Sequence, residues 1–381
     1  MPNAVSAGLS ADVIVVGAGA AGGAAAFHLA ARGRRVLILE RDPLPRPKAC
    51  GGGMAASVQR WFPFDLSPAV DQVIRQVRFS WCLDDPVTAV LPGDSPFWIV
   101  RRSQLDQFLV QQAVAAGAEL EDATIVESIQ PDGEGWCVAA GGRTYRSRAL
   151  VLADGSGSPF AAALGLGPAR PRFAAATAVE VDAPVQDPET ARFEFGLVRH
   201  GFCWAFPRRG GYSIGVGTFI GREVADSDLV LRQLLPSLGL DPMAGVRRQS
   251  PLRVWDGHHP LHNAAAVAVG DAASLCDPFL AEGLRPALLS GVRAAEAIDH
   301  HLSGDADALA GYSHTMRQAW GESMAWGRRI AQVFYRVPKV GYQLGIKRPT
   351  APQRIAQILS GELGYGDIAQ RVIKRLLFQK G

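Results

Sequence analysis

The stretch VIVVGAGAAGGAAAFHLAARGRRVLILERD, residues 13–42, limits what this chain can fold into more than any other part of it. Its first four residues are apolar and mostly β-branched, as in a strand that is buried on both faces. An alanine-rich helix follows, and then a second apolar strand, residues 35–39, which leads to Glu40. The turn between the first strand and the helix has the pattern GxGxxG, made by Gly17, Gly19 and Gly22.

Each part of this unit has a role in binding a dinucleotide. The first glycine permits a tight turn, the second lets a pyrophosphate approach the backbone, and the third lets helix and strand pack closely. The first helical turn, which includes Ala21, directs free N–H groups at the phosphates. Glu40 lies at the spacing expected of a carboxylate that binds the ribose hydroxyls. A helix packing that tolerates glycine would explain the three glycines, but not the two strands and the acidic residue that accompany them. The complete unit, in this order, therefore predicts a bound dinucleotide.

Composition restricts the setting of the protein. With 381 residues, 48% of them hydrophobic and 20% charged, the chain is typical of a globular protein with two domains. A net charge of +3 gives no reason to expect nucleic acid as a partner. The five cysteines include no CxxC pair and make an odd number, so we expect a reducing compartment and a cytoplasmic protein. Two adjacent histidine pairs lack a carboxylate at ligand spacing, and we predict no metal site.

Two further strand ends indicate which dinucleotide is bound. ALVLADGSGS, residues 149–158, is an apolar strand followed by Asp154 and Gly155, and a later apolar strand is followed by a Gly-Asp pair at Asp271, before a helix. Together with GxGxxG near the start, the Asp-Gly and Gly-Asp pairs make the chain similar to a group of flavoproteins. This group includes aromatic hydroxylases, flavin halogenases and geranylgeranyl reductases. The resemblance implies FAD as the cofactor, with Asp271 at its ribityl or phosphate region.

The same resemblance implies further contacts with FAD. The helix that begins near Gly283 and Leu284 would direct its N–H groups at the pyrimidine edge of the flavin, where they stabilise negative charge. Arg102, at the start of an amphipathic helix, is expected to reach the cofactor. Val126 would give backbone contacts to the adenine. Arg41 would lie against the adenine or ribose, with a solvated charge as the alternative.

Between residues 173 and 262 the strands alternate without parallel crossover helices, which favours an antiparallel sheet. In the segment GFCWAFP, Phe202, Trp204 and Phe206 share one face of a strand. Core packing would explain this pattern. The segment also resembles the YxWxFP signature of geranylgeranyl reductases, which ends at Pro207 here and has Tyr in place of Phe202, and the WxWxIP signature of flavin halogenases. We therefore expect these four residues to contact the substrate.

The fold class that follows is α/β: a Rossmann-type FAD-binding domain with an inserted antiparallel-sheet substrate domain and a helical C-terminal segment. The expected boundaries are residues 1–80, 98–170 and 262–330 for the FAD-binding domain, 81–97 and 171–261 for the substrate domain, and 331–381 for the C-terminal segment.

The loop RPKACGGGM, residues 46–54, follows the second strand, so its backbone is expected beside the flavin ring, with Cys50, Gly51 and Gly53 in contact with it. The bare glycine backbone would let the loop lie close to the isoalloxazine. The positive charge of Lys48 favours a thiolate at Cys50. A buried, inert thiol is the alternative. The segment resembles the KxCGG motif of geranylgeranyl reductases, which makes Cys50 the candidate catalytic residue.

These motifs predict FAD-dependent reduction of C=C bonds in an isoprenoid chain, in which a hydride comes from the reduced flavin and a proton completes the reaction. Cys50 would donate the proton or shape the site, and Trp204 and Phe206 would line an apolar tunnel for the chain. The electron donor would be NAD(P)H, bound transiently, or a reduced ferredoxin as a redox partner protein. The alternatives are hydroxylation or halogenation of an aromatic substrate, and a non-catalytic flavin-binding membrane adaptor.

The C-terminal segment is basic. From Arg328 to the end there are eleven Lys or Arg and two Asp or Glu, a charge of +9 against −6 for the rest. Residues 368–378 mix basic and apolar side chains, which suits peripheral docking on an anionic membrane surface, where prenyl lipids reside. A solvated cap on the FAD-binding domain is the alternative. The GEGI turn of the reductases is AEGLRP here, which leaves the substrate open.

Overall fold

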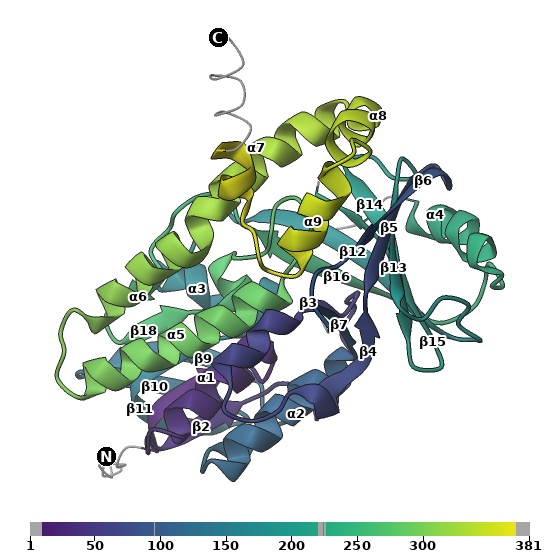
Figure 1. Cartoon of the computed structure of the whole chain (residues 1–381). Coiled ribbons are helices and arrows are strands. Elements are labelled where there is room, and N and C mark those ends of the chain that lie inside the picture. Colours follow the sequence, from purple (N-terminus) through teal and green to yellow (C-terminus); the bar gives the residue numbers. More distant parts are fainter. Residues whose placement is uncertain (1–9, 95, 220–223, 225, 371–381) are drawn as a thin grey trace, which may run out of the picture.

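The computed structural model describes residues 10–94, 96–219, 224 and 226–370. Figure 1 shows the two large sheets side by side, with helices α1, α2, α5 and α6 around the first sheet and α7, α8 and α9 together on one side of the molecule. The first sheet has eight strands in the order β17-β18-β11-β1-β2-β8, and β10 and β9 continue from β11. Its strands are β1 (Ala11–Val16), β2 (Val36–Leu39), β8 (Glu119–Glu121), β9 (Val126–Asp132), β10 (Gly135–Ala140), β11 (Arg143–Leu152), β17 (His262–Asn263) and β18 (Ala266–Ala268).

The predicted strand-helix-strand unit lies at the centre of this sheet. β1 is parallel to both of its neighbours, β2 and β11, and its apolar residues are buried. Gly17 has a φ of +102°, and a Cβ there would lie 2.5 Å from the carbonyl oxygen of Ala153. A Cβ on Gly22 would lie 1.9 Å from the carbonyl oxygen of Gly17. The first and third glycines are therefore required by backbone contacts within the turn.

Helix α1 (Ala20–Ala30) is buried along its whole length. It packs against α5 (Leu284–Leu302) and α2 (Arg102–Ala115), and glycines make both contacts close. A Cβ on Gly291 of α5 would lie 2.4 Å from the carbonyl oxygen of Ala21, and one on Gly23 would lie 2.9 Å from Leu109 Cβ. The spacing of the three helices therefore depends on residues without side chains.

The second sheet has seven strands in the order β16-β12-β15-β14-β13-β5-β6. It is antiparallel as predicted, except that β13 pairs with β5 in parallel. The predicted boundary between residues 80 and 81 falls inside β5, and both strands of the β5-β6 hairpin belong to this sheet. The strands are β5 (Gln76–Trp81), β6 (Asp84–Val90), β12 (Arg172–Asp182), β13 (Thr190–Phe195), β14 (Gly201–Arg208), β15 (Gly211–Thr218) and β16 (Arg247–Val254).

The remaining elements connect and cover the two sheets. A third sheet, β3-β7-β4, is formed by β3 (Gly53–Ala55), β4 (Val70–Ile74) and β7 (Phe97–Val100). The other helices are α3 (Phe160–Ala163), α4 (Ser227–Leu234), α6 (Ala308–Met316), α7 (Glu322–Arg336), α8 (Pro338–Gly341) and α9 (Ala351–Leu359), with π-helical turns at Arg317–Gly321 and Tyr342–Ile346. Short 3-10 segments include Gly155–Gly157 and Gly270–Ala273. Within the described ranges, no helix has the length and apolar character needed to cross a bilayer.

The contact between α1 and α5 can be tested with two glycine substitutions. Gly291→Ala should lower the free energy of unfolding by about 1–3 kcal/mol, because the new methyl group meets the backbone of α1. Gly311→Ala is the control, since a Cβ at this exposed position of α6 meets nothing within 4 Å. It should raise the free energy of unfolding by about 0.5–1 kcal/mol. Equal denaturant midpoints for the two variants would contradict the tight packing.

Candidate active site

One cavity brings together the cofactor motifs and the aromatic strand. Its walls come from the start of α1, the loop at residues 46–53, strands of the seven-stranded sheet and the start of α5. Among the residues predicted from the sequence, those that line it are Gly19, Ala21, Cys50, Gly51, Gly53, Arg102, Gly155, Phe202, Trp204, Phe206, Asp271, Gly283 and Leu284. The structure thus places residues from seven separate segments around a single space.

The start of α1 is suited to bind phosphates. Gly19 is the N-cap residue, and no side chain caps the helix, so its first N–H groups are free for a ligand. A Cβ on Gly19 would lie 3.6 Å from Arg46 Nη2 and 3.8 Å from Arg102 Nη2. Two guanidinium groups therefore lie above a helix N-terminus, as a bound pyrophosphate requires.

Glu40 is buried beside this turn. Its Oε2 accepts a hydrogen bond of 2.7 Å from the backbone N–H of Ala18, and its Oε1 lies 3.3 Å from Arg46 Nε. The Glu40 carbonyl oxygen accepts a hydrogen bond of 2.8 Å from the N–H of Thr124, which brings the segment before Val126 alongside it. The predicted ribose and adenine contacts thus come from adjacent segments.

Arg41 lies at the surface. Its side chain is 70% exposed, and its Nε lies 3.1 Å from Asp42 Oδ2. The contact of Arg41 with the cofactor stays a prediction, as does the solvated charge that the sequence allowed as an alternative.

Asp154 lacks partners of its own. Both of its carboxylate oxygens are buried, and no hydrogen bond of good geometry reaches them from the described residues, although the hydroxyl of Ser158 lies close. Burial raises the pKa of Asp154 to about 6. The hydroxyl of Ser158 and the charge of Arg253 act in the opposite direction and limit this rise. A buried carboxylate without donors is unfavourable, and the hydroxyl groups of FAD would supply them. The site therefore fits the cofactor that the sequence predicted.

The glycines of the loop at residues 46–53 are needed for packing. Gly52 has a φ of +79°, and a Cβ there would lie 2.1 Å from the carbonyl oxygen of Val100 in β7. A Cβ on Gly51 would lie 3.0 Å from Phe206 Cε2 and 3.2 Å from Trp204 Nε1. The bare backbone thus lets the loop fit between β7 and the aromatic strand, a constraint that the sequence did not reveal.

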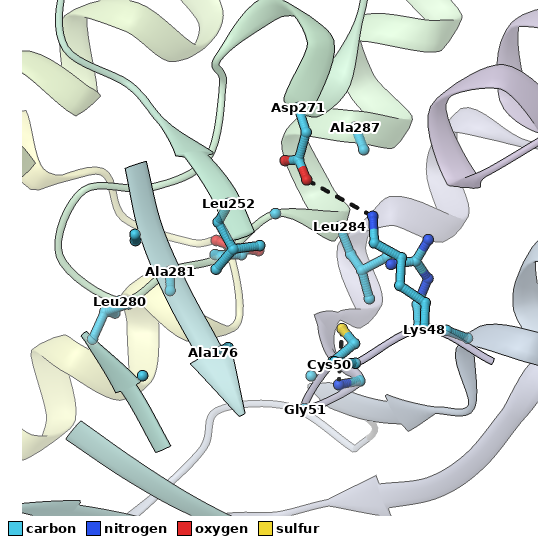
Figure 2. A pocket seen from close by; sticks show the side chains of 18 of the residues that line it. Lys48, Cys50, Gly51, Ala176, Leu252, Asp271, Leu280, Ala281, Leu284 and Ala287 are labelled. Atoms are coloured by element: carbon cyan, nitrogen blue, oxygen red, sulfur yellow. Dashed lines mark hydrogen bonds and ion pairs between the residues drawn. The ribbon is translucent and has the colours of Figure 1, made fainter. Parts of the chain in front are cut away.

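The cation beside Cys50 is not the one that the sequence predicted. Figure 2 shows Lys48 extended toward Asp271, and its Nζ lies 3.8 Å from Oδ2 of that carboxylate. Burial would lower the pKa of Arg102, but interactions with Asp106 and with Cys50 raise it above its ordinary value. Cys50 Sγ also accepts a hydrogen bond of 3.3 Å from the N–H of Gly52. Arg102 and this N–H therefore lie beside the Cys50 sulfur, whereas Lys48 is directed to Asp271.

The aromatic residues of β14 form one wall of the cavity. Phe202, Trp204 and Phe206 line it, while Cys203 and Ala205 pack into a separate hydrophobic core on the other face. Trp204 Nε1 is buried, and no described residue accepts a hydrogen bond from it. Pro207 is one position out of phase with the aromatic residues, so it does not belong to this wall. A contact of Pro207 with the substrate stays a prediction that this wall does not support.

Two further residues belong to the site although no sequence pattern predicted a role for them. Arg46 links the carboxylates of Glu40 and Asp106, at 3.3 and 3.5 Å. Glu282 lines the cavity with a side chain only 7% exposed, and its Oε1 has no hydrogen-bond partner among the described residues. Burial raises the pKa of Glu282 to about 7, against the charge of Arg285. Both lie in segments that were quoted, RPKACGGGM and AEGLRP, but neither pattern alone assigns them a role.

Cys50 borders a second pocket on the other side of its loop. Lys48, Cys50 and Arg102 line this pocket too, together with Glu180 and Arg248. The loop at residues 46–53 therefore separates an aromatic cavity from a polar pocket, and Cys50 belongs to both.

Comparison with known protein families gives one match, to the family described as FAD dependent oxidoreductase, over residues 12–83 and 88–296. Digeranylgeranylglycerophospholipid reductase 1 of Methanopyrus kandleri is 28% identical over 341 residues, which cover 82% of this chain and 86% of the relative. Menaquinone reductase of Mycobacterium tuberculosis is 29% identical over 352 residues, which cover 84% of this chain and 83% of the relative. The predicted resemblance to geranylgeranyl reductases is confirmed.

Solved structures support the fold. A geranylgeranyl bacteriochlorophyll reductase-like protein of Thermoplasma acidophilum has a TM-score of 0.82 at 20% identity, over 96% of this chain and 98% of that chain. The flavin-dependent brominase Bmp2 has a TM-score of 0.71 at 21% identity, over 96% and 98%. The predicted fold class is confirmed, and the likeness extends to flavoproteins with different reactions.

The packing of the Cys50 loop predicts an effect of Gly52→Ala. The variant should lose more than about 3 kcal/mol of unfolding free energy and most of its FAD, since the methyl group is strained by the positive φ and also meets the backbone of β7. Gly210→Ala is the matched control, with a φ of +76° and open space around the new Cβ. It should lose about 1 kcal/mol and keep FAD. Thermal unfolding and the ratio of flavin to protein absorbance measure both effects, and similar losses in the two variants would contradict the packing argument.

Proposed function

Because this chain belongs to the FAD dependent oxidoreductase family, we propose that it reduces C=C bonds in an isoprenoid chain, as an enzyme of the geranylgeranyl reductase type. One observation carries the proposal. The loop that holds Cys50 packs against Trp204 and Phe206, and all three line one cavity together with the start of α1, where we expect the phosphates of FAD. A thiol, an apolar wall and a flavin site are thus combined in one space.

Reduction of an isolated alkene requires a hydride on one carbon and a proton on the other. Bound FAD, in its reduced form, supplies the hydride. Cys50 Sγ gives its proton to the second carbon, and the thiolate that remains is stabilised by Arg102 and the N–H of Gly52. Solvent that enters the polar pocket behind the loop would return the proton to Cys50. The alkene thereby gains a hydride from the reduced cofactor and a proton that comes from solvent, and the electron donor would restore the reduced cofactor.

The wall of the cavity suits an apolar chain. Phe193 and Phe206 have ring centroids 5.1 Å apart, and Phe193 and Phe202 have centroids 5.8 Å apart, so the rings form a continuous apolar surface. A prenyl chain needs shape and apolar contact rather than hydrogen bonds. Hydroxylation or halogenation of an aromatic is the second candidate, because the same rings could stack on an aromatic substrate. A non-catalytic flavin-binding adaptor would not need the thiol beside the aromatic wall.

The electron donor stays a prediction, either NAD(P)H or a reduced ferredoxin. Its electrons must reach the flavin before the alkene binds or from another side of the ring. The polar pocket behind Cys50, lined by Lys48, Arg102 and Arg248, gives such an approach to an anionic donor.

We also propose peripheral contact with a membrane, through a C-terminal surface. Most of residues 368–378, on which the prediction was based, lie outside the described residues. Four large apolar side chains nearer the middle of the segment recur every three or four residues and are 48–68% exposed: Val333, Val337, Val340 and Leu344. Exposed Arg336 and Lys339 lie between them in the sequence. Apolar residues flanked by cations are typical of surfaces that bind anionic lipids.

The role of Cys50 is tested by Cys50→Ala in anaerobic single-turnover assays. The variant should bind FAD and accept electrons, but geranylgeranyl lipids should reoxidise it about a hundredfold or more slowly, since the positioned proton donor is gone. Cys137→Ala, at a half-buried position in β10, should reduce the lipid like the wild type. Full alkene reduction by Cys50→Ala would show that the thiol only packs. Reoxidation of the wild type by oxygen with aromatic acids, and not by prenyl lipids, would favour the second candidate.

Membrane contact is tested by charge insertion. Val340→Glu with Leu344→Glu should reduce binding to vesicles that contain anionic lipid by about tenfold or more, because two exposed apolar groups would be replaced by charges that anionic lipids repel. Leu229→Glu on α4, where the leucine is 58% exposed, is the control and should bind like the wild type. Unchanged sedimentation of the double variant with vesicles would leave the C-terminal segment as a solvated cap.

A further inference from the structure

A third pocket adjoins the candidate active site where the ends of β12 and β16 meet α7. Its basic residues are Arg172 at the start of β12, His200 in the loop before β14, and Arg328 and Arg336 on α7. Its apolar floor includes Phe219 and Tyr335, whose ring centroids are 5.2 Å apart. We refer to it as the basic pocket.

Helix α7 presents a single face to the basic pocket. The residues that line the pocket follow the helical repeat: Arg328, Ala331, Gln332, Tyr335 and Arg336. Tyr335 is anchored, because its hydroxyl donates a hydrogen bond of 2.9 Å to the carbonyl oxygen of Phe279. The two arginines of α7 are thereby fixed on the side of the helix that faces β12.

The positive charge of the basic pocket is not neutralised by the described residues. No carboxylate lines it, and none lies within ion-pair distance of its three arginines in the described part of the chain. Arg328 donates a hydrogen bond to the backbone carbonyl of Asp256, which leaves its charge unbalanced. Arg172 and Arg336 are exposed. Three guanidinium groups around one concave space favour an anion with several oxygen atoms, such as a phosphate.

The basic pocket adjoins the aromatic cavity along one face of the seven-stranded sheet. Arg172 pairs with Val254 across β12 and β16, and both line the basic pocket. The next pair on the same face, Ala174 and Leu252, lines the aromatic cavity. Phe219 lines both spaces. An extended ligand could therefore place a charged end among the arginines and its chain against the aromatic wall.

We propose that the basic pocket binds the phosphate-bearing head group of a prenyl lipid whose chain occupies the aromatic cavity. The proposal rests on the proposed function and narrows its substrate class to phosphorylated or phosphodiester prenyl lipids, as opposed to neutral prenyl alcohols and quinones. Arg172 and Arg336 form the ion pairs with the phosphate, and His200 lies beside them as a further hydrogen-bond donor. The exposed apolar surface Val333–Leu344 begins on the same helix, so lipid could enter from the membrane beside α7.

The first test compares substrates in steady-state reduction. The double variant Arg172→Gln with Arg336→Gln should raise the KM for geranylgeranyl phosphate about tenfold or more, from the loss of two charge-assisted interactions, with little change in kcat. The KM for geranylgeraniol should stay as in the wild type. Arg232→Gln, on exposed α4 away from the pocket, is the control and should change neither value. Equal effects on the phosphorylated and neutral substrates would overturn the proposal.

The second test measures binding without turnover, so that it remains decisive if no prenyl lipid is reduced. Calorimetry on the oxidised holoenzyme should show binding of geranylgeranyl phosphate that weakens about tenfold or more in the double variant and with rising salt. Geranylgeraniol and inorganic phosphate should each bind more weakly than the phosphorylated lipid, since each lacks one of the two contacts. Equal affinity in the wild type and the double variant, or equally tight binding of inorganic phosphate alone, would reject the head-group site. Binding as proposed without any alkene reduction would instead reject the proposed function.

Discussion

The close approach of backbones around α1 is the constraint on which the rest of the structure depends. Gly22 meets the carbonyl of Gly17, Gly291 meets the carbonyl of Ala21, and Gly23 meets Leu109, at distances that leave no room for a Cβ. These contacts hold α5 and α2 directly against α1. Because the starts of α5 and α2 carry Leu284 and Arg102, the same packing delivers two parts of the cofactor site to the GxGxxG turn. The site is thus a consequence of how tightly three helices can pack.

Within the site, each cationic side chain lies next to at least one carboxylate. Arg46 lies between the carboxylates of Glu40 and Asp106, Arg102 between Asp106 and Cys50, and Lys48 beside Asp271. Buried charges are unfavourable unless paired, so this chain of ion pairs fixes the cations where a pyrophosphate and a thiolate need them. Asp154 makes no such ion pair, and Glu282, although paired with Arg285 through Oε2, keeps its buried Oε1 without a described partner. These two carboxylates mark the places where a ligand would complete the hydrogen bonding.

The two large sheets form different parts of the candidate active site. The eight-stranded sheet supplies the strand ends and helix starts that suit a charged, polar cofactor, whereas the seven-stranded sheet supplies an apolar wall. The Cys50 loop lies between them, held to β7 by Gly52 and to the aromatic strand by Gly51. Helix α7 then adds positive charge at the far end of that wall. Along one face of the sheet, the surface therefore changes from cofactor site to apolar channel to basic pocket.

The sequence alone determined the parts of this protein that depend on local backbone chemistry. GxGxxG, the apolar strands and the alternation of Phe202, Trp204 and Phe206 each act over a few residues, so their consequences could be predicted and were found. The match of the short motifs to those of flavoproteins predicted the family and the fold.

Only the tertiary structure decided which groups meet across the chain. The partner of Cys50 is Arg102 and not the nearer Lys48, because α2 packs its first turn against the loop while Lys48 extends to Asp271. Pro207 leaves the aromatic wall because the strand places it out of phase. The basic pocket joins residues 172, 200, 328 and 336, which no local pattern connects. Side chains separated by tens to hundreds of residues are brought together by sheet register and helix packing, and these are properties of the whole fold.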